Sequence, residues 1–154
     1  MINMKTQISV LKKSREITLK AIQGLTLEQL HKIPSGFKNN IAWNVAHLVV
    51  TQQLLHYNLS GLSCLVPEDL ITRYRKGTFP DKEFTEEEFE EIKELLIGLP
   101  DTLEEDYNAG VFKEYNEYMS STGYVMDSIE SAISFNNFHE GMHLGIIMSL
   151  KKMI

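Results

Sequence analysis

The chain has 154 residues, of which 43% are hydrophobic and 23% charged, and this composition excludes disordered, collagen-like and low-complexity proteins. The 15 Lys and Arg residues against 21 Asp and Glu residues give a net charge of -6, which disfavours nucleic acid as a partner because a phosphate backbone attracts basic surfaces. We expect one domain over residues 1–154, with no signal peptide and no membrane span, since no stretch approaches the ~18 consecutive apolar residues of a span.

The first predicted helix covers about residues 5–23. Its apolar positions recur every three or four residues between Ile8 and Ile22. Gly24 follows, where a helix end favours a left-handed residue. Arg15 interrupts the apolar stripe.

The second predicted helix covers residues 41–59, with Asn39 or Asn40 as its capping residue and Gly61 after its end. One face of this helix carries Trp43, His47, Val50 and Leu54. That face is expected to point into the core.

A long connection, residues 61–84, comes next, and it contains Pro67, Gly77 and Pro80. Connections of this length are functional or mobile. Its basic residues are Arg73, Arg75 and Lys76. A solvated surface is the simpler interpretation of this basic run, and contact with a substrate carboxylate is the alternative.

The third predicted helix begins at Thr85, because Thr85–Glu88 has the form of a capping box and places acidic side chains at the positive end of the helix dipole. Gly98 and Pro100 interrupt its apolar stripe. Residues 101–107 therefore form either a kinked continuation or a separate short helix.

The fourth predicted helix covers residues 127–150, with Glu130 in an acidic variant of the capping box and Lys151 and Lys152 at the negative end of the dipole. Four such helices favour an all-α fold, a four-helix bundle with a long connection between the second and third helices.

The strongest local signal is the segment His139-Glu140-Gly141-Met142-His143. Its two histidines lie ~40° apart around a helix and can bind one ion. The segment matches the H-E-x-x-H pattern of zinc proteases, many of which take a third ligand downstream. None of the eleven residues after His143 is His, Asp, Glu or Cys, so the sequence disfavours a protease.

The third ligand is therefore expected upstream, at His47 on the inward face of the second helix. Alone, His47 would be interpreted as a hydrogen-bonded core histidine. Together with His139 and His143 it predicts a metal site whose remaining coordination positions are open, which is typical of catalysis. His56 lies ~180° from His47 and is expected on the surface, and His31 is expected to be a solvated loop residue.

Three segments resemble the DinB-like superfamily, which includes the YfiT-type metal-dependent proteins and thiol transferases. They are Asn40–Leu48, Thr51–Leu55 and Asn137–Gly145. The resemblance runs over nearly the whole chain. It implies an up-down-down-up bundle that binds a divalent metal through one histidine of the second helix and two of the last, at positions that match His47, His139 and His143.

The resemblance also implies a reaction. Characterised relatives join a low-molecular-weight thiol such as bacillithiol, mycothiol or glutathione to an electrophile, or isomerise a substrate with that thiol. We therefore expect a transferase that acts on a small-molecule substrate and uses Zn, Ni or Fe. A hydrolase using metal-bound water, and a non-enzymatic metal-binding module of the stress response, are the alternatives. The resemblance also allows a homodimer.

Few other residues attract a functional interpretation, and no catalytic residue is assigned. Asn136 and Glu140 are candidate pocket residues, although a buried amide and a solvated carboxylate are the plainer interpretations. Cys64 is the only cysteine, so it cannot form an internal disulfide, and a reducing compartment, the cytoplasm, is expected. Nothing basic close to it in sequence lowers its pKa, so it is not expected to be a nucleophile.

Overall fold

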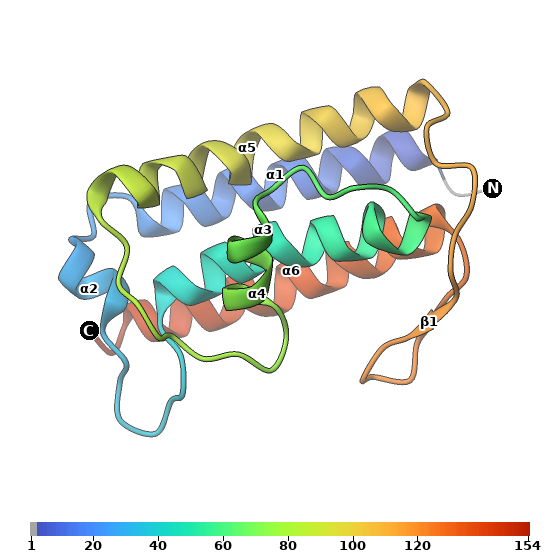
Figure 1. Cartoon of the computed structure of the whole chain (residues 1–154). Coiled ribbons are helices and arrows are strands. Elements are labelled where there is room, and N and C mark those ends of the chain that lie inside the picture. Colours follow the sequence, from blue (N-terminus) through green and yellow to red (C-terminus); the bar gives the residue numbers. More distant parts are fainter. Residues whose placement is uncertain (1–2) are drawn as a thin grey trace.

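Four long helices make up most of the structure, a computed structural model that describes residues 3–154. They are α1 (Met4–Ile22), α3 (Ile41–His56), α5 (Glu86–Asn108) and α6 (Ile129–Lys151). Along the bundle α1 and α6 run in one direction and α3 and α5 in the other, an up-down-down-up arrangement (Figure 1). The predicted all-α bundle is thus confirmed. Within residues 3–154, no helix combines the length and the apolar character that crossing a membrane requires.

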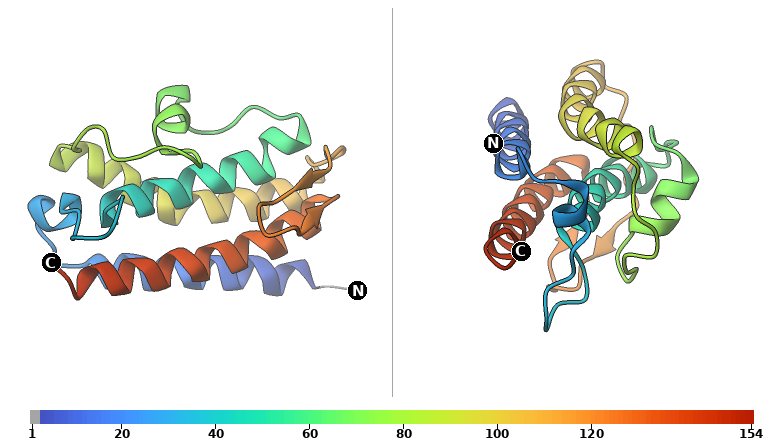
Figure 2. Two further views of the ribbon diagram at one scale, coloured as in Figure 1. Left: turned by 90° about the horizontal axis from the view of Figure 1, so that it is seen from below. Right: turned by 90° about the vertical axis from the view of Figure 1, so that its left-hand side faces the viewer.

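The connections contain short elements that the sequence did not predict. A helix, α2 (Leu27–His31), precedes α3, and a 3₁₀ turn, η1 (Asn58–Ser60), and α4 (Glu68–Tyr74) follow it. The strand β1 (Tyr118–Met119) pairs antiparallel with β2 (Val125–Met126) just before α6. Figure 2 shows that α4 lies outside the bundle, beside α3. The long connection is therefore partly helical.

Most helix ends follow the predicted signals. Asn40 caps α3 by accepting a hydrogen bond from the Trp43 amide at 2.8 Å. Thr85 and Glu88 form the predicted capping box of α5. Gly24 adopts the predicted left-handed conformation after α1, with φ of +79°.

Two helix boundaries differ by two or three residues from the approximate predictions. The helix α6 begins at Ile129, because the Ser128 side chain caps it and Ser131, rather than Glu130, completes the capping box. The helix α3 ends at His56 rather than near residue 59, because the chain turns there into η1.

Arg15 explains how α5 continues through Pro100 as one helix. Proline has no N–H group, so the carbonyl oxygen of Leu96, four residues earlier, loses its usual helical partner. The Nη1 of Arg15 donates to that oxygen at 3.0 Å. Residues 101–107 therefore continue the same helix.

Arg15 also forms a fully buried ion pair with Glu140. Its Nε donates to both carboxylate oxygens at 3.0 Å, and its Nη2 donates to one of them at 2.7 Å. The same Nη2 donates to the carbonyl oxygen of Leu48 at 3.0 Å. Its partners lie on α3, α5 and α6, so this one side chain on α1 links all four long helices.

The helix α3 is enclosed on nearly all sides, which corrects the prediction for His56. Of its 16 residues, 14 are buried, because α2, α4, α5, α6 and η1 all pack against it. His56 is 0% exposed. The helical wheel placed it correctly opposite His47, but that side faces the bundle interior rather than solvent.

His31 is also not a solvated loop residue. It ends α2 and is partly buried. Its Nδ1 donates to the Leu27 carbonyl oxygen at 2.8 Å, and its Nε2 accepts a hydrogen bond from the Phe84 amide at 3.0 Å. This imidazole joins α2 to the segment that enters α5.

We predict that Arg15→Met lowers the free energy of unfolding by about 3–5 kcal/mol, because it leaves the Glu140 carboxylate buried without a partner. The double variant Arg15→Met/Glu140→Leu should recover the part of this loss that comes from the unpaired carboxylate, while the Leu96 carbonyl oxygen stays without its partner. Urea unfolding followed by circular dichroism measures both. As a control, Lys13→Met breaks the exposed pair of Lys13 and Glu16 and should change stability little. A double variant as unstable as Arg15→Met would contradict the prediction.

We further predict acid destabilisation through His56, whose pKa is lowered to about 3 by burial and by the charge of Arg15. In the unfolded chain the His56 imidazole takes up a proton near pH ~6.5, whereas in the folded protein it does so only near pH ~3. Between these two pH values only the unfolded state is protonated at His56. The free energy of unfolding therefore decreases as the pH is lowered through this range, by about 1.4 kcal/mol per pH unit from His56 alone. His56→Gln should reduce that slope, measured by urea unfolding at several pH values. An unchanged slope would refute it.

Candidate metal centre

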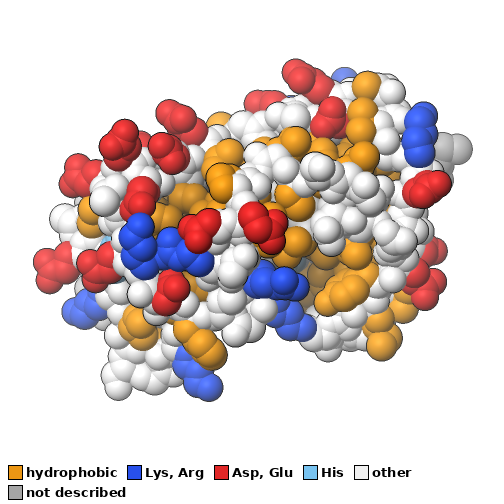
Figure 3. Space-filling view, in the orientation of Figure 1, with side chains coloured by type: hydrophobic (Ala, Val, Ile, Leu, Met, Phe, Trp, Pro, Cys, Tyr) orange, Lys and Arg blue, Asp and Glu red, His pale blue; other side chains and the backbone are white. Residues whose placement is uncertain are grey.

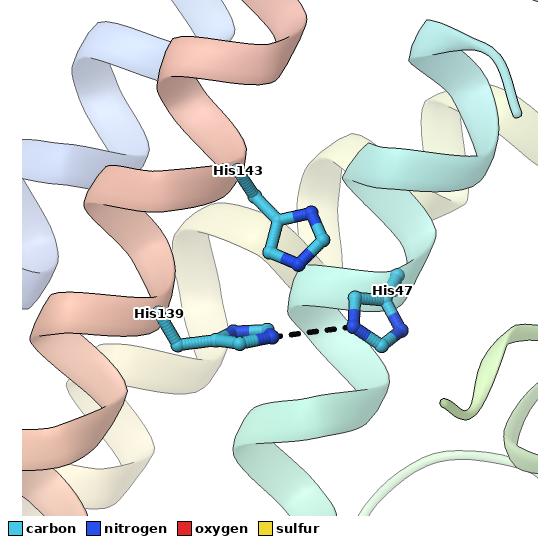
Figure 4. Close-up of side chains that lie close together, drawn as sticks. All are labelled: His47, His139 and His143. Carbon is cyan, nitrogen blue, oxygen red and sulfur yellow. Dashed lines mark hydrogen bonds between the residues drawn. The ribbon is translucent and has the colours of Figure 1, made fainter. Parts of the chain in front are cut away.

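The structure brings together the three histidines that the sequence singled out. His47 extends from α3, and His139 and His143 extend from the facing side of α6 (Figure 4). The Nε2 atoms of His47 and His139 are 3.2 Å apart. One ligand nitrogen from each of the three residues lies within 4.8 Å of the others. All three side chains are buried.

A main-chain oxygen fixes the tautomer of His47. Its Nδ1 lies 2.7 Å from the carbonyl oxygen of Tyr74, the last residue of α4. A carbonyl only accepts, so Nδ1 carries the proton and Nε2 presents its lone pair on the side of the other histidines, where it also accepts from the Thr51 hydroxyl at 3.3 Å. The ring also stacks on Trp43, with centroids 4.6 Å apart and planes 12° from parallel. Its orientation is therefore fixed from two sides.

Asn44 performs the same task for His143. Its side-chain nitrogen donates to the carbonyl oxygen of Asn40 at 2.7 Å and to Oδ1 of Asn39 at 3.1 Å. These bonds assign the remaining amide atom as the oxygen, which lies 2.8 Å from Nδ1 of His143. Nδ1 of His143 is thus the donor, and its Nε2 is left free.

His139 has a different environment. Its Nδ1 is buried and has no hydrogen-bond partner among the described residues. Its Nε2 faces Nε2 of His47, which holds a lone pair. A proton or a cation between the two nitrogens relieves the repulsion between facing lone pairs.

Burial keeps all three imidazoles neutral at pH 7. It lowers the pKa of His47. Burial and the neighbouring histidines lower the pKa of His139 to about 2 and that of His143 to about 3. Metals bind neutral imidazole, so the site does not have to release protons to accept an ion.

The donor set fits a divalent transition metal. Two nitrogens ~2.1 Å from a tetrahedral ion are ~3.4 Å apart, close to the 3.2 Å between the Nε2 atoms of His47 and His139. Three imidazoles leave at least one coordination position open, and such donors suit Zn, Ni and Fe alike. The hydroxyl of Thr51 lies 3.3 Å from Nε2 of His47 and lines the same cavity as the three histidines.

The histidines open onto a cavity of about 510 Å³, a size that suits a small molecule. Its apolar wall includes Trp43, Leu54, Phe135, Phe138 and Met142. The connection after α3 and the β1–β2 turn complete the wall. A larger hollow of about 700 Å³ lies between α1, α2 and the start of α5, but none of the histidines lines it. The smaller cavity, which the three histidines line, is therefore the candidate functional site.

Asn136 and Glu140, expected as pocket residues, lie elsewhere. Both are 0% exposed and neither lines the cavity. Glu140 is held by Arg15 on another side of α6 from the histidines. Cys64 lies half-buried in the connection, where burial raises the pKa of its thiol and its Sγ donates to the carbonyl oxygen of Gln53.

The sequence interpretation missed Asn44 and Tyr74, which orient two of the histidines. Asn44 did carry a signal, because it is a lone amide inside the otherwise apolar run from Ile41 to Ala46. A buried polar side chain in such a run requires a partner. Tyr74 acts through its backbone, so its residue type carries no signal.

Comparison with known families agrees with this geometry. The profile described as the DinB superfamily matches residues 11–147, which is most of the chain, and the chain belongs to this family. No curated protein matches the chain. The family match and the three-histidine group together support a site that is able to hold a metal ion.

We predict that Asn44→Ala weakens Zn²⁺ binding about 10–100-fold, because His143 loses the acceptor that fixes its tautomer and ring plane. Asn44→Asp retains an acceptor and should keep most of the affinity. Competition with a chromophoric chelator measures the affinities. Asn58→Ala is the matched control, since Asn58 lines the same cavity and makes no hydrogen bond to the three histidines within the described residues. Equal affinities for Asn44→Ala and the control would contradict the assignment.

Proposed function

We propose that this member of the DinB superfamily is a divalent-metal-dependent transferase that joins a low-molecular-weight thiol to an electrophilic small molecule. The observation that carries the proposal is the convergence of three neutral imidazoles at an open cavity. A structural metal site closes its coordination with four protein ligands, whereas a site with three leaves room for a substrate atom.

Different residues of the chain would bind the ion and orient the histidines in such a reaction. His47, His139 and His143 would hold the ion, and Asn44 and the Tyr74 carbonyl keep two of these histidines in the tautomer that binding requires. When bound, a divalent ion favours loss of the thiol proton and so supplies a nucleophilic sulfur at neutral pH. In the overall transfer a carbon–sulfur bond would form, the bond from that carbon to the leaving group would break, and the leaving group would depart with the proton that the thiol gives up.

The wall of the cavity favours this reaction over peptide hydrolysis. In the H-E-x-x-H proteases the glutamate between the two histidines acts as general base. Here Glu140 is paired with Arg15 away from the cavity and cannot reach a substrate there. The apolar side chains of the cavity limit competing water around the sulfur. We place the reaction in the cytoplasm, because a thiol substrate and the free Cys64 suit a reducing compartment.

We predict that His143→Ala loses the bound metal and abolishes thiol consumption while the protein stays folded. The protein is purified without a metal-affinity tag, and its metal content is measured by elemental analysis. Wild type and variant are then incubated with a panel of small thiols and a model electrophile. Circular dichroism checks that the variant is folded, since a catalytic ion contributes less to folding than a structural one.

His31→Gln is the matched control, because His31 lies outside the site and should leave metal content and turnover unchanged. Metal-dependent cleavage of esters or amides without thiol consumption would instead identify a hydrolase. Metal binding without either activity would favour a non-enzymatic module.

A further inference from the structure

The cavity that holds the histidines differs in charge from the rest of the molecule. The chain contains 21 Asp and Glu residues, yet none of the described residues that line this cavity is acidic. Arg75 and Lys76 both line it. In Figure 3, Lys and Arg side chains lie over α4 and the loop after it, next to an apolar hollow. The cavity is thus a basic region in an acidic protein.

Within residues 3–154, no acidic side chain neutralises the charges of Arg75 and Lys76. Neither residue has an acidic partner within 4.0 Å in the described part of the chain. Arg73, two residues earlier, is bound to Asp69 at 3.7 Å and to Asp81 at 3.2 Å. Of the three basic residues in this segment, the two that line the cavity are therefore the two that remain available to a ligand.

The segment that carries these cations is attached to the metal centre. The Tyr74 carbonyl, which precedes Arg75, accepts the hydrogen bond of His47. The Thr78 hydroxyl accepts from Nε1 of Trp43 at 3.2 Å and donates to the Arg75 carbonyl at 2.8 Å. The backbone of Arg75 therefore has a fixed position relative to the ligand His47.

The turn between these two anchors depends on Gly77, whose φ of +89° is a conformation that residues with a side chain rarely adopt. It returns the chain to Trp43 and presents Arg75 and Lys76 on the cavity wall. Apolar side chains such as Leu54, Phe135 and Phe138 line the same cavity.

We propose that the cavity binds a small organic acid, with its carboxylate or phosphonate group at Arg75 and Lys76 and its apolar body against the aromatic wall. The inference rests on the proposed function in one respect, that the other end of this molecule reacts beside the three histidines. A fork of guanidinium donors suits such an anionic group. A neutral analogue leaves these cations without a partner and binds more weakly.

The test uses Trp43, the single tryptophan of the chain, as a reporter inside the cavity. Chelator-treated full-length protein is titrated with phenylacetate, benzylphosphonate and the neutral phenylacetamide, and the fluorescence of Trp43 is followed. We expect at least one of the two acids to bind about tenfold more tightly than the amide, the size of one charge-assisted hydrogen bond. The two acids separate a carboxylate preference from a phosphonate preference.

Two variants test whether Arg75 and Lys76 cause the preference for the acids over the amide. Arg75→Gln/Lys76→Gln should abolish the preference for the acid and leave amide binding unchanged. Arg73→Gln is the matched control and should keep the preference, because the partners of Arg73 are Asp69 and Asp81. Thermal unfolding of Arg75→Gln/Lys76→Gln should match that of the wild type, since the replaced side chains of Arg75 and Lys76 are exposed.

Equal affinity for acid and amide, absence of acid binding at the highest soluble concentration, or the same loss in Arg73→Gln would each overturn the inference. The readout needs neither metal nor turnover. Failure of thiol transfer with an intact acid preference would therefore refute the proposed reaction alone, whereas thiol transfer without an acid preference would refute this inference alone.

Discussion

The buried ion pair of Arg15 and Glu140 is the constraint on which the rest of the bundle depends. Removing two charges from water costs several kcal/mol for each ion unless every polar group finds a partner. Here the guanidinium meets a carboxylate on α6 and carbonyl oxygens on α3 and α5. Because Glu140 directly follows His139, seating its carboxylate also sets the rotation of α6 about its axis. The directions of His139 and His143 follow from that rotation.

The helix α6 shows why a short motif does not determine a reaction. Consecutive residues lie ~100° apart around a helix, so the residue after a metal ligand is carried to a different face. In this bundle that face belongs to the core beside α1, where Arg15 takes the carboxylate of Glu140. The two histidines retain their function as candidate ligands, while the glutamate becomes part of the framework. The segment His139–His143 therefore contains two candidate metal ligands and one residue, Glu140, that stabilises the bundle.

The helices and the direction of the three histidines could be predicted because the spacing of residues encodes them. The buried polar contacts could not, because they depend on partners far away in the sequence. Four helices and the inward phase of His47, His139 and His143 could be predicted from spacing alone. Outward phase did not imply exposure for His56, because α3 lies at the centre of the bundle. Arg15 interrupts a predicted apolar stripe and Asn44 lies unnoticed in an apolar run, because their partners lie 125 and 99 residues away. The helix α4 and the β1–β2 pair are too short to show a period.

The two oriented histidines, His47 and His143, differ in the kind of mutation that can alter their orientation. His47 is aligned by a main-chain oxygen, which any residue at position 74 would supply, so exchanging that side chain leaves the acceptor in place. Only a change of length or path in the connection that carries α4 displaces it. His143 depends on a side chain, so a single codon can alter its basicity. During divergence, point mutations at position 44 can therefore change the basicity of His143 in small steps. The orientation of His47 changes only through insertions or deletions in the connection that carries α4.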